Sequence, residues 1–159
     1  MADVLTPEQR KLNMSRIRDK NTKPELILRK GLHSLGLRFR LHRNDLPGKP
    51  DIVIPKHRVV ILVHGCFWHG HNCHLFKQPT TRSDFWRSKI SANRERDKTI
   101  VQQLNIDKWR VLSVWECSLR GKKRLSMDSV LSMCVDFING DAVQGEIVGS
   151  SGTSLTEKH

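Results

Sequence analysis

The chain has 159 residues, with 28 Lys and Arg against 16 Asp and Glu, so its formal charge at neutral pH is +12. This length fits one compact domain. The sequence has neither an apolar run of the about 20 residues that cross a bilayer nor a signal peptide. We therefore exclude a membrane-spanning protein and expect a cytoplasmic one. The basic charge favours a polyanionic partner, above all nucleic acid, because each neutralised phosphate releases counterions.

Capping signals predict two helices near the start of the chain. Thr6-Pro7 begins the first, which forms a helical arm over about residues 1–20. Thr22 begins the second, in which leucines recur at helical spacing as far as Gly36. The alternating segment 37–43 (LRFRLHR) then predicts a half-buried strand.

Later segments predict a sheet flanked by helices. The predicted strands are 51–54, 59–63 and 109–115, and the predicted helices are 83–104 and 125–138. Five consecutive apolar residues at 59–63 indicate a central strand buried on both faces. From Gly140 on, Gly, Ser and Thr dominate, which predicts a flexible tail over 140–159 after a single domain over 1–139. Helices beside a mixed sheet make the fold class α/β or α+β.

The segment 64–74 (HGCFWHGHNCH) concentrates four histidines and two cysteines. Cys66, His71 and Cys73 lie within eight residues, so one Zn²⁺ could bind all three. A structural zinc site needs a fourth ligand, and Cys117 is the best candidate because it follows the strand 109–115. The alternative, in which the cysteines are only core residues, is weaker because this loop has few aliphatic side chains.

Two details of the zinc prediction stay open at this point. His69 or His74 could replace His71, which ranks first because of its spacing from both cysteines. Cys134 recurs at helical spacing with Val130 and Phe137, so we expect a plain buried thiol there. Without an export signal, the cysteines should stay reduced rather than form disulfides.

Several aromatic residues admit two interpretations. Phe67 and Trp68 are neighbours in the metal-rich loop and cannot easily both point inward. On a basic protein such rings can act as stacking platforms or as wedges between base pairs, and spacing alone does not separate a wedge from a core role. Trp86 belongs to the same question, because it lies near the start of a helix. Three other aromatics, for which we expect the core, are Phe85, Trp109 and Trp115.

Five polar residues could support hydrolysis of a phosphodiester. Asp51, which precedes a hydrophobic strand, could hold Mg²⁺, or it could belong only to the turn after Pro50. Glu25 stands at a capping-box position and could serve only the helix start. Asp97 could lie on a solvated helix face or orient a histidine. One of His64 and His69 could then act as a general base near neutral pH.

Taken together, these motifs closely resemble the very short patch repair (Vsr) endonucleases from about Asn13 to Gly121. The motifs are PGKPD at 47–51, HGCFWHGHNCHLFK at 64–77, TRSDFW at 81–86, NRERD at 93–97 and WRVLSVWECSLRG at 109–121. The resemblance implies a restriction-endonuclease-like α/β fold: a central mixed sheet flanked by helices, with one structural zinc. It also implies a bacterial cytosolic enzyme that needs Mg²⁺ and nicks one DNA strand 5′ of the thymine in a T:G mismatch. Such mismatches arise when 5-methylcytosine deaminates, so the nick would start very short patch repair.

The resemblance also implies a role for each matching residue. The zinc ligands would be Cys66, His71, Cys73 and Cys117, and the DNA wedge would be Phe67, Trp68 and Trp86. Asp51 would bind Mg²⁺, His69 would be the general base, and Glu25, His64 and Asp97 would support the site. The N-terminal helix, about residues 6–18, would approach the opposite groove. The partner would be double-stranded DNA with a T:G mismatch, other repair proteins could also bind, and a monomer would suffice to nick one strand.

Two positions depart from the family pattern. Val63 stands where Thr is common, and we expect its backbone carbonyl, which any residue supplies, to ligate Mg²⁺. Gly70 stands where His is common, which removes no predicted ligand but should loosen the loop. The lysine that restriction enzymes carry after a second acidic residue is also absent, and His64 and His69 occupy that neighbourhood.

Two other functions remain open at this level. A non-catalytic zinc-containing DNA-binding module would account for the charge and the cysteine-histidine cluster. A histidine-metal nuclease of another fold would need a catalytic metal site that includes His74.

Overall fold

The computed structural model describes residues 22–67, 69–71, 73, 80–150 and 153–156. At its centre is a six-stranded sheet with the strands in chain order. They are β1 (Arg40–Leu41), β2 (Ile52–Ile54), β3 (Val59–His64), β4 (Arg110–Trp115), β5 (Gln144–Ile147) and β6 (Thr153–Thr156). β3 pairs parallel to β4 and β4 parallel to β5, whereas the other neighbours are antiparallel. The predicted mixed sheet is confirmed.

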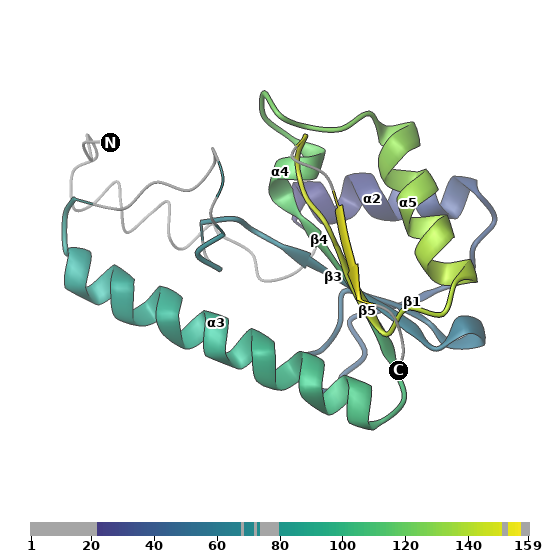
Figure 1. The fold of residues 1–159 in the computed structure, drawn as a ribbon, viewed down its shortest axis with the longest axis horizontal. Helices are drawn as coiled ribbons and strands as arrows, with labels where there is room; N and C mark the ends of the chain where they lie inside the picture. The colour runs from purple at the N-terminus through teal and green to yellow at the C-terminus, as the bar shows by residue number, and fades with distance from the viewer. Residues whose placement is uncertain (1–21, 68, 72, 74–79, 151–152, 157–159) are drawn as a thin grey trace.

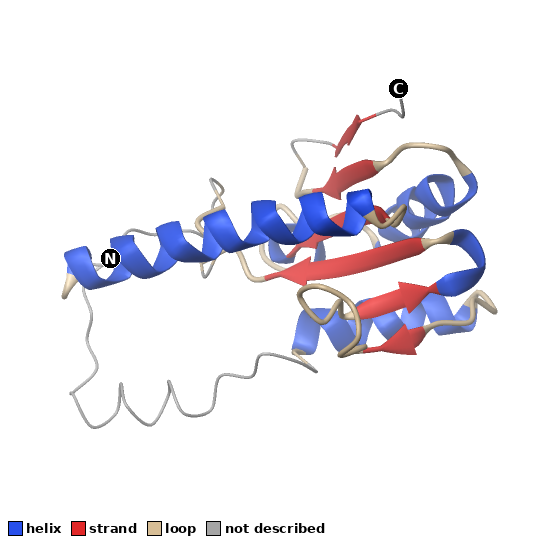
Figure 2. Cartoon of the chain, turned by 90° about the horizontal axis from the view of Figure 1, so that it is seen from below, coloured by secondary structure: helices blue, strands red, loops and turns tan. Residues whose placement is uncertain are grey.

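Helices cover both faces of this sheet, as an α/β fold requires. They are α2 (Lys23–Ser34), α3 (Ser83–Ile106), α4 (Glu116–Leu119) and α5 (Met127–Asn139), and a short 3-10 turn (Pro55–His57) joins β2 to β3. α2, α4 and α5 lie on one face, and α3 crosses the other (Figure 1). The N-terminal half of α3 extends past the ends of the strands (Figure 2).

Each face of the sheet has its own hydrophobic core. The larger core joins leucines of α2 and the apolar side of α5 to the sheet, with Leu28, Leu112 and Val130 fully buried. The smaller core packs Leu104 of α3 against Val60 and Val111. β3 supplies both cores, which confirms that this apolar strand is buried on both faces.

Local signals set the helix boundaries. The Thr22 hydroxyl accepts the Glu25 backbone N–H at 3.4 Å and caps α2. Ser126 caps α5 in the same way, by accepting from the Ser129 backbone N–H. Both are ordinary N-caps that satisfy an otherwise unpaired backbone donor. The helix predicted from residue 6 lies outside the described residues.

Two segments differ from the sequence prediction. The strand expected over 37–43 is reduced to Arg40–Leu41, because His42 adopts a left-handed backbone (φ 47°) that ends the strand. The flexible tail expected from residue 140 instead contains β5, which pairs with β4 and buries Ile147. Pairing with a central strand supplies the hydrogen bonds that Gly- and Ser-rich composition does not reveal. Within the described ranges, no helix is long and apolar enough to cross a membrane.

Candidate active site and metal centre

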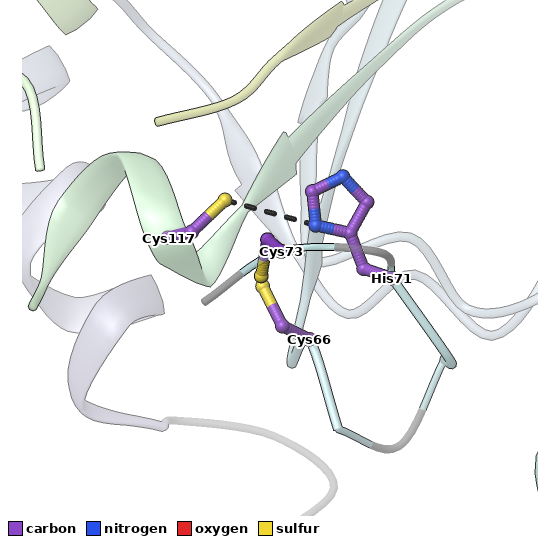
Figure 3. Close-up of side chains that lie close together, drawn as sticks. All are labelled: Cys66, His71, Cys73 and Cys117. Atoms are coloured by element: carbon purple, nitrogen blue, oxygen red, sulfur yellow. Dashed lines mark hydrogen bonds between the residues drawn. The ribbon is translucent and has the colours of Figure 1, made fainter. Parts of the chain in front are cut away.

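Three cysteines and one histidine meet beyond the ends of β3 and β4. Cys66, His71 and Cys73 come from the loop after β3, and Cys117 comes from α4 (Figure 3). Their potential ligand atoms all lie within 4.8 Å of one another, and the Cys117 Sγ is 3.7 Å from His71 Nδ1. Three thiols and one imidazole make a donor set that is consistent with a structural zinc site.

The backbone prearranges this cluster. The His71 N–H donates to the Cys66 carbonyl at 2.9 Å, which closes the loop between these two ligands. The Cys66 N–H donates to Glu116 Oε1 at 3.1 Å, and the Gly149 N–H donates to Cys117 Sγ at 3.3 Å. Burial raises the pKa of the Cys66 and Cys117 thiols, so metal binding there would have to displace protons.

The structure places His71 and His69 in different clusters. His71 belongs to the thiol cluster, whereas His69 belongs to a different cluster with His64 and Asp97. His74 lies outside the described residues. Cys134 is fully buried in the larger core, as predicted, and burial raises its pKa to about 12. All four cysteines are free thiols.

A cavity of about 430 Å³ opens beside the thiol cluster, between α3 and the sheet. Its lining includes His42, Asp51, Val63, His64, His69 and Asp97. The antiparallel pairing of β2 with β3 brings the start of β2 next to the end of β3. For this reason the cavity receives Asp51 from one strand and Val63 and His64 from the other.

Asp51 and Glu25 form an acidic pair at one side of this cavity, in which Glu25 is buried and Asp51 is half-buried. The Val63 backbone N–H donates to Asp51 Oδ2 at 2.7 Å. Glu25 is 1% exposed, although only its backbone takes part in the helix cap, so its side chain serves another purpose. Burial, and secondarily the charge of Glu25, raises the pKa of Asp51 to about 7. Two carboxylates within 4.8 Å of each other and largely shielded from water would be stabilised by a cation.

His64, His69 and Asp97 form a second cluster in the same cavity. His69 Nδ1 lies 2.5 Å from Asp97 Oδ2, and the His64 and His69 ring centroids are 4.4 Å apart. Because an ionised carboxylate only accepts hydrogen bonds, this contact requires a proton on Nδ1, so that Nε2 is the acceptor in the neutral imidazole. Burial lowers the pKa of His64 to about 3, so this imidazole is neutral.

Aromatic side chains gather near the projecting end of α3. The rings of Phe67 and Trp86 meet edge-on with centroids 5.4 Å apart, and Phe85 contacts Trp86 at 5.2 Å. Phe85 is 44% exposed under the Arg82 guanidinium, so the expectation that it joins the core is wrong. Trp109 and Trp115 are buried, as predicted. Trp68 lies outside the described residues.

The two unusual positions also have structural explanations. Gly70 has a φ of +62°, and a Cβ there would lie 2.6 Å from Ile90 Cγ2. Glycine therefore packs the loop closely against α3 rather than loosening it. The Val63 side chain packs against the larger core.

Sequence reasoning missed His42, which lies beside the acidic pair Glu25–Asp51. His42 Nε2 lies 2.7 Å from Glu25 Oε2, and His42, Glu25 and Asp51 could together contact one metal ion. The sequence around His42 lacks the closely spaced histidines and cysteines that indicate a metal site, and its only local feature was its position near the end of a predicted strand. The contact joins Glu25 of α2 to the residue that follows β1, 17 positions later in the chain.

Comparison with known proteins accounts for this combination of sites. The model of the family described as "DNA mismatch endonuclease Vsr" matches residues 2–75. The DNA mismatch endonuclease Vsr of Escherichia coli (strain K12) is 43% identical over 147 residues, which cover 92% of this chain and 94% of that protein. The chain belongs to the Vsr DNA mismatch endonuclease family.

Other members of the Vsr family are similar over a shorter range. The type II nicking enzyme V.XorIIP of Xanthomonas oryzae pv. oryzae is 54% identical over 119 residues, covering 75% of this chain and 88% of that enzyme. The type II nicking enzyme V.NmeAIP of Neisseria meningitidis is 42% identical over 122 residues, covering 77% and 87%. The expectation of a strand-nicking DNA endonuclease is confirmed at the level of the family.

Proposed function

We propose that this chain is a Mg²⁺-dependent endonuclease that nicks one DNA strand 5′ of the thymine in a T:G mismatch and thereby starts very short patch repair. The observation that carries this proposal is the joint cavity, which Asp51 lines together with the cluster His64–His69–Asp97, while the buried Glu25 lies beside Asp51. Family membership supports the DNA substrate, and the E. coli relative is described as a mismatch endonuclease.

The acidic pair has the chemistry that Mg²⁺ requires. Carboxylate and carbonyl oxygens are its preferred ligands, and burial of Asp51 beside Glu25 leaves negative charge that a cation would neutralise. Asp51 would ligate the ion directly and Glu25 would support it. When bound there, Mg²⁺ would polarise the scissile phosphate and activate a water molecule.

The backbone of Val63 fits a second ligand position. Its N–H points to Asp51, and the N–H and C=O of one strand residue point to the same side of the strand. Beyond Ile52, which faces Ile61, no residue of β2 pairs with this part of β3. The Val63 carbonyl is therefore suited to ligate the ion, and a valine in place of threonine costs nothing at this ligand.

His69 is suited to take the proton from the attacking water. Its Nε2 is an acceptor because Asp97 binds Nδ1–H, and an imidazole is effective as a base near neutral pH. Water would donate its proton to Nε2 while its oxygen bonds to phosphorus and the P–O ester bond 5′ of the thymine breaks, and the leaving alkoxide oxygen would take a proton from solvent. The neutral, buried His64 packs against His69 and limits its movement.

Charge and aromatic residues support recognition of a mismatch. The formal charge of +12 provides affinity for the DNA backbone. Phe67 and Trp86 contact each other at the projecting end of α3, and with Trp68 they would enter the DNA beside the mismatch. A wobble pair costs less to unstack than a Watson–Crick pair, so a wedge can select it by deformability.

The thiol cluster would hold Zn²⁺ in a structural role. A closed set of four protein ligands leaves no position for substrate. Cys66 and His71 flank the segment that carries Phe67 and His69, so the ion would fix both the wedge and the general base.

The test compares nicking of two end-labelled duplexes that differ only in one T:G mismatch or T:A pair, with Mg²⁺ and with EDTA. We expect one nick 5′ of the mismatched thymine, lost with EDTA and lost in Asp51→Ala. Asp107→Asn, which changes an exposed carboxylate at the far end of α3, is the control and should retain full activity. Several flanking sequences, including methylated-cytosine sites, should be tested in parallel.

Two outcomes would contradict the proposal. Binding without nicking on every duplex would favour the zinc DNA-binding module. Nicking that survives Asp51→Ala would move catalysis away from the acidic pair.

A further inference from the structure

His42 contacts both residues of the acidic pair, Asp51 through the backbone and Glu25 through the side chain. The antiparallel pairing of β1 with β2 continues one residue beyond Leu41, where the His42 backbone N–H donates to the Asp51 carbonyl at 3.3 Å. The imidazole Nε2 lies 2.7 Å from Glu25 Oε2. One residue therefore holds the backbone of Asp51 and the side chain of Glu25.

The backbone of His42 has an unfavourable conformation. Its φ of 47° lies in the left-handed region, which is uncommon for residues other than glycine. This conformation ends β1 and accompanies the turn of the side chain toward α2. Non-glycine residues persist in such conformations when surrounding contacts hold them, frequently near functional sites.

The second partner of Glu25 cannot replace His42. Arg29 Nη1 lies 3.3 Å from the same oxygen, Oε2, but its side chain is 23% exposed and it belongs to the same helix as Glu25. A contact within α2 cannot fix α2 relative to the strand that carries Asp51. His42 makes that connection from a different element, and its side chain is 18% exposed.

We propose that His42 is a positioning residue, which aims the Glu25 carboxylate at Asp51 and so sets the geometry in which the pair receives a divalent cation. This inference rests on the proposed function of the acidic pair. The imidazole would act through Glu25 rather than touch the ion, because its Nε2 is engaged with the carboxylate. Hydrogen-bond partners behind metal ligands commonly change metal affinity or activity by about 10–100-fold when they are replaced.

The experiment uses the full-length protein and measures Mn²⁺ affinity without DNA, by the electron paramagnetic resonance signal of free Mn²⁺. The variants are His42→Leu, which removes the hydrogen-bond donor, and His42→Gln, whose amide can donate to Glu25. His33→Leu replaces an exposed histidine of α2 and is the matched control. Thermal unfolding and duplex binding in EDTA are measured for each variant.

We expect His42→Leu to weaken Mn²⁺ binding about 10–100-fold and to raise the Mg²⁺ concentration for half-maximal nicking by a similar factor. Duplex binding in EDTA should not change. His42→Gln should recover most of the affinity, and His33→Leu should match the wild type. Recovery of Mn²⁺ affinity in His42→Gln would show that the hydrogen bond to Glu25 matters, rather than only the volume of the side chain.

Three results would overturn the inference. Wild-type Mn²⁺ affinity in His42→Leu would show that Glu25 needs no support from His42. A loss in both His42 variants that parallels a fall in thermal stability would make the contact merely structural. A loss in both at unchanged stability, with a weakened preference for Co²⁺ or Zn²⁺, would make His42 a direct ligand instead.

Asp51→Ala separates this inference from the proposed function. If Asp51→Ala still binds Mn²⁺ at this site and nicks DNA, the proposed function fails. If Asp51→Ala loses both properties while His42→Leu retains them, only the role of His42 fails.

Discussion

The imidazole of His71 stacks on the indole of Trp115, with ring centroids 4.2 Å apart and ring planes 12° apart. The same indole contacts His64, with centroids at 4.8 Å. Trp115 ends β4 and faces His64 in the parallel pairing of β3 with β4. A single buried ring therefore links the thiol cluster to the histidines of the cavity.

We expect replacement of Trp115 to slow nicking more than it weakens DNA binding. Trp115→Phe keeps an aromatic face for both histidines, whereas Trp115→Leu removes it and leaves a partial cavity. The Leu variant should lose about 10-fold or more in single-turnover rate, equivalent to about 1.4 kcal/mol, and the Phe variant should lose less. Rates, duplex affinity and zinc content should be measured together. Equal rates in all three proteins would mean that Trp115 does not position the histidines.

Removal of zinc should loosen the last part of the sheet. Cys117 Sγ accepts a hydrogen bond from the Gly149 N–H, close to the end of β5, and Val148 packs against the cluster. Cys117→Ser should therefore lose bound zinc and also amide-exchange protection over 144–147. Metal analysis and hydrogen exchange measure the two effects. The control is Cys134→Ala, which should keep one zinc per chain. Retained amide-exchange protection over 144–147 in the zinc-free protein would contradict the link between the zinc site and β5.

The half-buried Asp51 should make the stability of the protein without divalent cation depend on pH. Its pKa rises from an ordinary value of 3.8 to about 7, so between these values the folded state binds more protons than the unfolded chain. The free energy of unfolding should therefore fall as pH rises through this window, by at most about 1.4 kcal/mol per pH unit. Urea unfolding between about pH 4.5 and 7.5, which lies close to this pKa window, measures the slope of the unfolding free energy against pH. The slope reports on the coupled Asp51–Glu25 pair rather than on Asp51 alone. Asp51→Asn should flatten it, and parallel profiles would mean that Asp51 has an ordinary pKa.

Removal of the Trp86 ring should weaken discrimination between a mismatch and a paired duplex. The ring contacts Phe67 and Phe85 at the end of α3, and stacking on a base contributes about 1–3 kcal/mol. Trp86→Ala should lower the T:G to T:A ratio of nicking rates by about 10-fold, with the protein still folded by circular dichroism. Trp109→Phe, which changes a buried tryptophan of the smaller core, is the comparison and should retain the ratio. An unchanged ratio in Trp86→Ala would remove this residue from the wedge.

Gly70 should tolerate no side chain. Gly70→Ala combines an unfavourable positive φ with a Cβ 2.6 Å from Ile90, whereas Gly36→Ala has a positive φ and open space around it. The conformational term alone should cost about 1–2 kcal/mol in each variant, and overpacking should add about 1–3 kcal/mol only at Gly70. Urea unfolding of both variants isolates the packing term. Equal losses would mean that the loop moves away from α3 without penalty.

Much of this protein follows from signals that act over a few residues. The apolar run in β3 and the cap at Thr22 determine the elements that contain them, because strand burial and helix capping are local properties. The spacing of Cys66, His71 and Cys73 determines that one ion could bind all three. The family motifs indicated the nuclease, because they bring this chemistry together in a fixed order.

Other features were decided only by contacts between distant segments. Glu25 looked like a helix cap and became a buried partner of Asp51, and the contact between Glu25 and His42 joins residues that are 17 positions apart in the chain. β5 looked like a tail because its four residues are too few for a pattern, yet pairing with β4 supplies the hydrogen bonds that order it. Side-chain direction and long-range strand pairing depend on the packing of whole elements, and no short stretch of sequence carries that information.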